Sequence, residues 1–245
     1  MEWADEGIVL SVRPYGETSA IVEALTHLHG RHLGLVHGGA SRKSRAMLQP
    51  GNSLHITWRA RLNEHLGSLH AELLRARAGA LLERRDALIG LNAFSAMAAS
   101  VLPEREPHVG VYGAAEVLLD AIAEQDFTHW PPLYVRWESG LLDDLGFGLD
   151  FSRCAATGLT QDLIYVSPRS GRAVSREAGE PYADRLLRLP PFLLGSQSAE
   201  PSAADILDGL KLTAYFLLER VLQPHGKELP QPRIRLQELA ANESQ

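Results

Sequence analysis

The hydrophobic pattern of the chain changes near residue 75, and this change constrains the fold more than any other feature. Before it, short apolar runs alternate with turns that contain Gly or Pro, which is typical of β-strands. After it, stretches rich in Ala, Leu, Arg and Glu end at Gly, Pro or acidic residues, which indicates helices. A chain of 245 residues is long enough to bury two cores. We therefore expect two domains, at residues 1–75 and 76–245.

The first part of the chain predicts a small β-barrel. Three apolar runs separated by turns suggest a meander, at residues 8–12, 19–25 and 33–36. A fourth strand alternates clearly, with Leu54, Ile56 and Trp58 on one face and polar residues on the other. A short helical turn capped by Ser41 precedes that strand, and the run 66–74 after it fits either a strand or the start of a helix. Five short strands with an interrupting helical segment suit a barrel of the oligonucleotide-binding (OB) kind.

The second part predicts an all-α domain with one interruption. Helices are expected at residues 78–85, 91–101, 111–124, 133–145 and, beginning at Ser202, 203–222. Between about 151 and 180 the apolar run 163–166 and a Ser-Pro-Arg-Ser-Gly turn predict a hairpin insert. The fold class expected is therefore α+β, with an N-terminal OB-fold barrel followed by a helical domain that carries a small insert.

A local reversal of charge is the best sequence clue to function. The protein has a formal net charge of −6, yet residues 31–63 contain no Asp or Glu. The cations of this stretch are Arg31, Arg42, Lys43, Arg45, Arg59 and Arg61. Like charges repel one another unless they face solvent or an anionic partner, and a nucleic-acid backbone is the commonest extended anion. We expect these residues to bind phosphates, with a plain solvated loop as the alternative for residues 42–45.

Other residues that could carry chemistry have simpler explanations. Trp58 belongs to the apolar set of its strand and should pack in the core, whereas Tyr15 in a polar turn could stack on a base. We expect the histidines of the 26–32 turn (His27, His29 and His32) to form a solvated hairpin tip rather than a metal site, because no cysteine or carboxylate pair completes one. Glu138, Asp143 and Asp144 share one helix surface and should face solvent.

Enzyme and membrane signatures are missing from the sequence. It has no P-loop, no G-x-S-x-G and no H-E-x-x-H motif, which points away from catalysis and from a bound cofactor or metal. No apolar run approaches the roughly 18 to 20 residues that span a bilayer. Cys154 is the single cysteine, so no disulfide framework can form, and we expect a cytoplasmic protein.

Two blocks of sequence, taken in order, resemble the RecO family of DNA repair proteins. The first block comprises residues 6–10, 15–19, 38–45 and 48–51, and the second comprises residues 137–151 with Arg153, Cys154 and Gly158. The resemblance implies a zinc-finger-like insert after the second block. Many members carry two CxxC pairs there, but this chain has Cys154 and Thr157 at the first pair and Ser175 and Ala178 at the second. One thiolate cannot provide four zinc ligands, so we expect the insert to fold without metal.

The resemblance also implies a role and partners. Proteins of this kind bind single- and double-stranded DNA, anneal complementary strands, contact the acidic C-terminal tail of the single-stranded DNA-binding protein SSB, and act with RecR to load RecA. Arg136 lies in the matching helical segment and is a candidate contact for the SSB tail, because a guanidinium suits a carboxylate. Two alternatives stay open at this point, an RNA-binding factor of the translation or ribosome machinery and an enzyme without a local motif.

Overall fold

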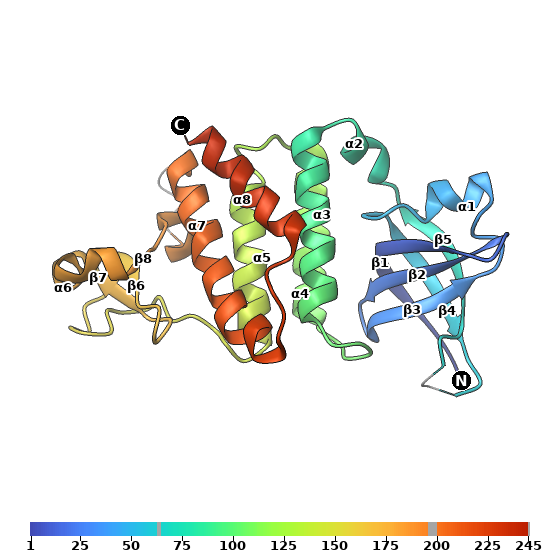
Figure 1. The fold of residues 1–245 in the computed structure, drawn as a ribbon, viewed down its shortest axis with the longest axis horizontal. Coiled ribbons are helices and arrows are strands. Elements are labelled where there is room, and N and C mark those ends of the chain that lie inside the picture. Colours follow the sequence, from blue (N-terminus) through green and yellow to red (C-terminus); the bar gives the residue numbers. More distant parts are fainter. Residues whose placement is uncertain (63–64, 196–199, 245) are drawn as a thin grey trace. The chain divides into compact units, whose positions relative to one another are not determined.

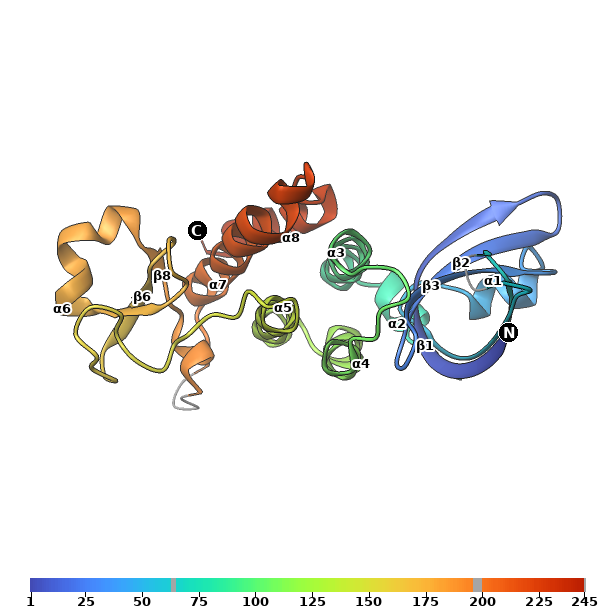
Figure 2. The ribbon, with the colours of Figure 1, turned by 90° about the horizontal axis from the view of Figure 1, so that it is seen from below.

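The structure, a computed structural model, describes residues 1–62, 65–195 and 200–244. Its contacts group the chain into two compact units, Met1–Glu124 and Gln125–Gln245. The first unit holds a β-barrel and the helices that follow it, and the second holds further helices with a small sheet (Figures 1 and 2). The domain boundary expected at residue 75 stays a prediction.

The barrel has the topology of an OB-fold. Its strands are β1 (Glu2–Tyr15), β2 (Ser19–Thr26), β3 (Gly30–Val36), β4 (Ser53–Arg59) and β5 (Ser68–Arg75). They close in the order β1-β2-β3-β5-β4, and α1 (Arg42–Met47) connects β3 to β4. The pairs are antiparallel except β3 with β5, which meet parallel at Leu35 and Ser68. The predicted α+β fold with an N-terminal OB barrel is confirmed, and the ambiguous run 66–74 is mostly strand.

The alternation in β4 builds the barrel core. Leu54, Ile56 and Trp58 are fully buried, while His55 and Arg59 on the other face are exposed. Trp58 also donates a hydrogen bond from its indole Nε1 to the carbonyl of Leu66 at 3.0 Å, so its polar atom is satisfied inside the core. The expected core position of Trp58 is confirmed.

A buried arginine attaches the following helices to the barrel. These helices are α2 (Ala78–Leu82), α3 (Arg85–Val101) and α4 (Val109–Glu124). Arg77, just before α2, donates from Nε to Asp120 at 2.6 Å and from Nη2 to Glu116 at 2.5 Å, both on α4. Its Nη1 reaches Ser53 Oγ at 2.6 Å on β4. This one guanidinium thus joins strand and helix, and the sequence pattern gave no sign of it.

The second unit is built from helices α5 (Pro131–Asp144), α7 (Ala203–Phe216) and α8 (Gln231–Glu243), with a π-helical continuation of α7 at Leu217–Leu222. Ser202 caps α7 as expected, because its Oγ accepts from the Asp205 N–H at 3.1 Å and the Asp205 carboxylate accepts from the Ser202 N–H at 3.0 Å. Helix α8 was not expected from the sequence. Of the helices described, none combines the length and the apolar character that a membrane span requires.

The insert contains the expected hairpin and one strand more. Strands β6 (Leu163–Val166) and β7 (Ala173–Ser175) pair antiparallel, and β8 (Leu187–Arg188) adds to β6; the short helix α6 (Arg176–Gly179) follows β7. Cys154 is buried, and the N–H and hydroxyl of Ser175 lie 3.3 and 3.4 Å from its Sγ. Burial raises the pKa of the Cys154 thiol, but hydrogen bonds from Ser175 and Thr157 outweigh burial and lower the pKa to about 6. Residues aligned with two separate CxxC pairs therefore meet in space.

Two expectations about polar residues were wrong. Glu138 does not face solvent but is fully buried, where Arg233 of α8 donates to its two carboxylate oxygens at 2.6 and 2.8 Å. His32 is not part of a solvated hairpin tip, because it is only 6% exposed and packs edge-on against Trp3 and Trp58. Burial is also the main reason that the pKa of His32 is lowered. In both places the core encloses a polar side chain, ion-paired in the case of Glu138 and packed edge-on against aromatic rings in the case of His32.

Candidate nucleic-acid interface

The first cationic group lies on α1. Arg42, Lys43 and Arg45 are exposed, and the helix has no buried residue and no acidic residue in its first turn. Ser41 fixes the start of the helix, since its Oγ accepts from the Ser44 N–H at 3.2 Å. Within the described part of the chain, no carboxylate forms an ion pair with these three side chains. Their positive charge is therefore available to an external anion.

A second group surrounds a hollow on the outer face of the barrel. The hollow measures about 330 Å³ and is lined by His37, Arg59 and His70 together with Thr57 and Ser68. The strand register explains the grouping, because Thr57 pairs with His70 and Arg59 pairs with Ser68. His37 and His70 were not among the residues predicted to bind phosphates. His70 could have been found had the run 66–74 been assigned to a strand, because it then shares a face with Ser68.

An acidic residue of β1, Glu2, partly neutralises the charge beside this hollow. Arg59, whose side chain is 67% exposed, pairs with Glu2 at 2.7 Å. Arg61 is exposed two residues beyond β4. Arg59 is thus partly neutralised within the protein, unlike the cations of α1.

The two groups do not form a single cluster. Ala60, between Arg59 and Arg61, accepts a hydrogen bond from the N-terminal amine at 2.7 Å. Figure 1 places the N-terminus at the edge of the barrel away from α1. A ligand that contacts both groups must therefore extend along the barrel, as a nucleic-acid strand does.

Arg31 lies in a different environment from the other predicted site residues. Its side chain is 14% exposed, forms an ion pair with Glu23, and donates from Nε to the carbonyl of Leu102 at 3.0 Å. Glu104 lies 3.7 Å from the same guanidinium. These partners already neutralise most of the charge of Arg31. That Arg31 contacts a phosphate stays a prediction, and these bonds count against it.

The exposed end of β1 adds two residues to the candidate surface. Arg13 pairs with Ile21 and Tyr15 pairs with Ser19 in the β1–β2 register. Arg13 is exposed, and Tyr15 is 55% exposed, so its ring is accessible to a base. Arg13 was overlooked because it precedes the stretch without acidic residues.

Arg136 lies in the second unit, on α5. It is exposed, and its Nη2 donates to the carbonyl of Phe192 at 2.9 Å. That bond fixes one edge of the guanidinium and leaves its other donors for a ligand. Its predicted contact with an SSB tail stays a prediction.

As for metals, the described residues contain no group of three or more His, Cys, Asp or Glu placed to hold an ion.

Comparisons with known proteins cover almost the whole chain. The family model described as "Recombination protein O N terminal" matches residues 1–77, and "Recombination protein O C terminal" matches residues 82–229. The chain is 53% identical to the DNA repair protein RecO of Rhodospirillum rubrum over 241 residues, which are 97% of this chain and 96% of that protein. It is 53% identical over 243 residues to the protein of the same name from Cereibacter sphaeroides, covering 98% of this chain and 99% of the relative.

A relative from a third genus agrees. The DNA repair protein RecO of Phenylobacterium zucineum is 52% identical over 236 residues, which are 96% of each chain. Both halves of the chain therefore match the same family in the expected order, and the chain belongs to the RecO family of DNA repair proteins.

Proposed function

We propose that the chain binds single- and double-stranded DNA through its barrel and anneals complementary strands. The observation that carries this proposal is the set of exposed cations on α1, which form no ion pair with the described residues although the protein is acidic overall. Such cations release counterions from phosphates and bind without regard to base sequence. Neutralising two complementary strands also reduces their mutual repulsion, which is what annealing requires.

The proposed role in the cell is that of a recombination mediator without chemical turnover. With RecR, the chain would load RecA onto single strands coated by SSB, while Arg136 contacts the acidic SSB tail. The resemblance to the RecO family supports this assignment of partners. The exposed guanidinium of Arg136, which can still donate hydrogen bonds on one side, supports the tail contact. Membership of a DNA repair family does not favour the RNA-binding alternative.

The first test measures the affinity for labelled single-stranded DNA across a salt series. We expect the change of Arg42, Lys43 and Arg45 to Ala together to weaken binding on the order of 100-fold at about 0.1 M salt. The slope of log affinity against log salt should flatten by about 2, because each cation that no longer neutralises a phosphate reduces it by about 0.7. The same variant should no longer accelerate annealing, followed by energy transfer between labelled complementary strands.

A matched control removes equal charge elsewhere. Arg153, Arg169 and Arg185 are exposed residues of the second unit, and changing them to Ala lowers the net charge by the same amount. This control should change neither the affinity nor the slope appreciably. Equal losses of affinity in both triple variants would show that overall charge, not a local site, governs binding. Tighter binding of an RNA strand of the same sequence and length would revive the RNA alternative.

A further inference from the structure

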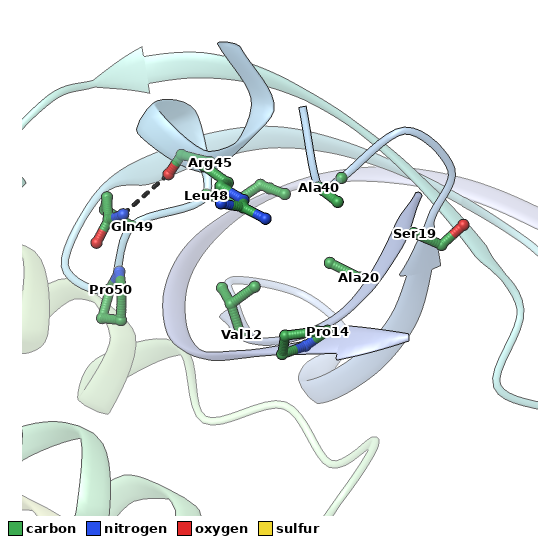
Figure 3. Close-up of a pocket in the computed structure, with 10 residues that line it drawn as sticks. Val12, Pro14, Ser19, Ala20, Ala40, Arg45, Leu48, Gln49 and Pro50 are labelled. Atoms are coloured by element: carbon green, nitrogen blue, oxygen red, sulfur yellow. Dashed lines mark hydrogen bonds between the residues drawn. The ribbon is translucent and has the colours of Figure 1, made fainter. Parts of the chain in front are cut away.

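A hollow beside α1 is not explained by phosphate binding alone. It measures about 280 Å³ and lies between α1, the end of β1 and the start of β2 (Figure 3). Its floor is apolar, formed by Val12, Ala20 and Leu48, and Pro14 and Pro50 also line it. Its size is just below the usual range of about 300–1,000 Å³ for small-molecule sites, so its occupant must be small.

One cation lies at the rim of this hollow. Figure 3 shows the Arg45 side chain reaching over it from α1, while the Ser19 hydroxyl and the Gln49 amide oxygen point away from it. Gln49 Nε2 donates to the Arg45 carbonyl at 3.0 Å, which orients the amide and leaves its oxygen as an acceptor. The hollow therefore combines apolar walls with a planar cation at its rim.

We propose that this hollow receives one unstacked base of a DNA single strand, whose flanking phosphates are held by Arg42, Lys43 and Arg45. The inference deepens the proposed DNA-binding function and depends on it. A guanidinium can stack on the face of a base, and apolar walls favour a planar ring removed from water. The site would give the barrel a preference for single strands, because a paired base cannot enter.

The main competing occupant is an acidic peptide with an apolar side chain, and the backbone argues against it. Carboxylates are usually captured by free N–H groups or by paired cations. Here three successive N–H groups of the loop before α1 are already used, since Gly39 donates to Val36, Ala40 to Thr18 and Ser41 to Gly38. Among the described residues, Arg45 is the one cation that lines the hollow. A phosphate strand can also use Arg42 and Lys43 while its base fills the hollow.

The test compares normal and abasic DNA on a pocket-filling variant. Ala40→Phe fills the hollow without removing a charge, and Ala46→Phe, at an exposed position of α1, is the matched control. Affinities of each protein are measured by fluorescence anisotropy for oligothymidylate and for an abasic strand with the same number of phosphates. Thermal unfolding checks that each variant stays folded.

We expect the wild type and Ala46→Phe to prefer oligothymidylate by about five- to tenfold, the order of one stacked base. Ala40→Phe should lose this preference but keep the salt slope, because its phosphate-binding cations are intact. If folded Ala40→Phe keeps the full preference, the inference is wrong. A different result would favour a protein partner and overturn the inference: the wild type shows no preference for oligothymidylate, and an acidic peptide ending in Phe binds the wild type but not Ala40→Phe. Failure of the wild type to bind either strand would instead refute the proposed function.

Discussion

At the scale of single residues, the two arginines that pair with Asp120 differ in burial. The Arg77 side chain is 2% exposed and also pairs with Glu116, whereas the Arg75 side chain is 51% exposed. We expect Arg77→Ala to lower the free energy of unfolding by about 2–4 kcal/mol, because it leaves Glu116 without its cation and removes the buried one of the two cations beside Asp120. Arg75→Ala should cost less than about 1 kcal/mol, because an exposed pair is screened by water.

Urea denaturation of both variants measures this difference. Arg77→Lys is a useful third variant, since an ammonium group cannot reach strand and helix together as the guanidinium does. It should recover only part of the lost stability. If Arg75→Ala and Arg77→Ala lower the free energy of unfolding equally, burial does not decide the strength of this junction.

The distance along the chain between an arginine and its partner explains which arginine roles could be predicted from the sequence. A run of cations without acids marked Arg42, Lys43 and Arg45, and these are exposed as predicted from the pattern. Arg77 and Arg233 carry the same charge, yet their partners lie far along the chain, 39 residues away in Glu116 and 95 in Glu138. A local pattern cannot reveal such pairs, because only the fold brings them together.

At the scale of elements, the β2–β3 turn depends on a glycine that has no room for a side chain. Gly30 has φ +67°, and a Cβ there would lie 1.9 Å from the carbonyl oxygen of Glu106. We expect Gly30→Ala to destabilise the protein by about 3 kcal/mol or more, because backbone must move as well as adopt a strained φ. Gly16, in the β1–β2 turn, also has a positive φ but open space around it. Gly16→Ala should cost only about 1 kcal/mol.

Thermal unfolding of the two glycine variants provides the measurement. A similar drop in stability at both positions would show that the backbone conformation alone, and not the close approach of the 102–106 segment, constrains the β2–β3 turn. A larger drop at Gly30 would identify this turn as a point of attachment between the barrel and the connection from α3 to α4.

Elements with a strong local signal were predicted well, and those without one were missed. The alternation of β4 and the caps at Ser41 and Ser202 correspond to real elements. Helix α8 was missed because it is mostly polar and has a weak apolar face, although Leu236 and Ala240 anchor it. The first half of β1 was missed because Glu2-Trp3-Ala4-Asp5-Glu6 reads as an acidic terminus. Its pairing with β4 makes it a strand.

At the scale of the whole molecule, the compact unit that contains the barrel extends well beyond β5. It reaches Glu124 and includes α2, α3 and α4, of which α3 packs against β1. Leu81 and Leu91 lie against Gly51, at the turn before β4, and Arg77 bonds to Glu116 and Asp120 of α4. The buried surface of the barrel thus continues into helices that the sequence pattern assigned to a separate domain.

This arrangement predicts how fragments of the chain will behave. A fragment of residues 1–124 should unfold cooperatively on heating and bind single-stranded DNA with the salt slope of the full chain, because it keeps both α1 and the Arg77 junction. A fragment of residues 1–75 should lack a cooperative transition, because it loses α3, which packs against β1, together with Arg77 and its partners on α4. Calorimetry measures how cooperatively each fragment unfolds, and fluorescence anisotropy measures its affinity for single-stranded DNA. If the shorter fragment unfolds cooperatively and binds DNA equally well, the barrel is an independent domain that ends at residue 75 and the helices do not support its DNA-binding face.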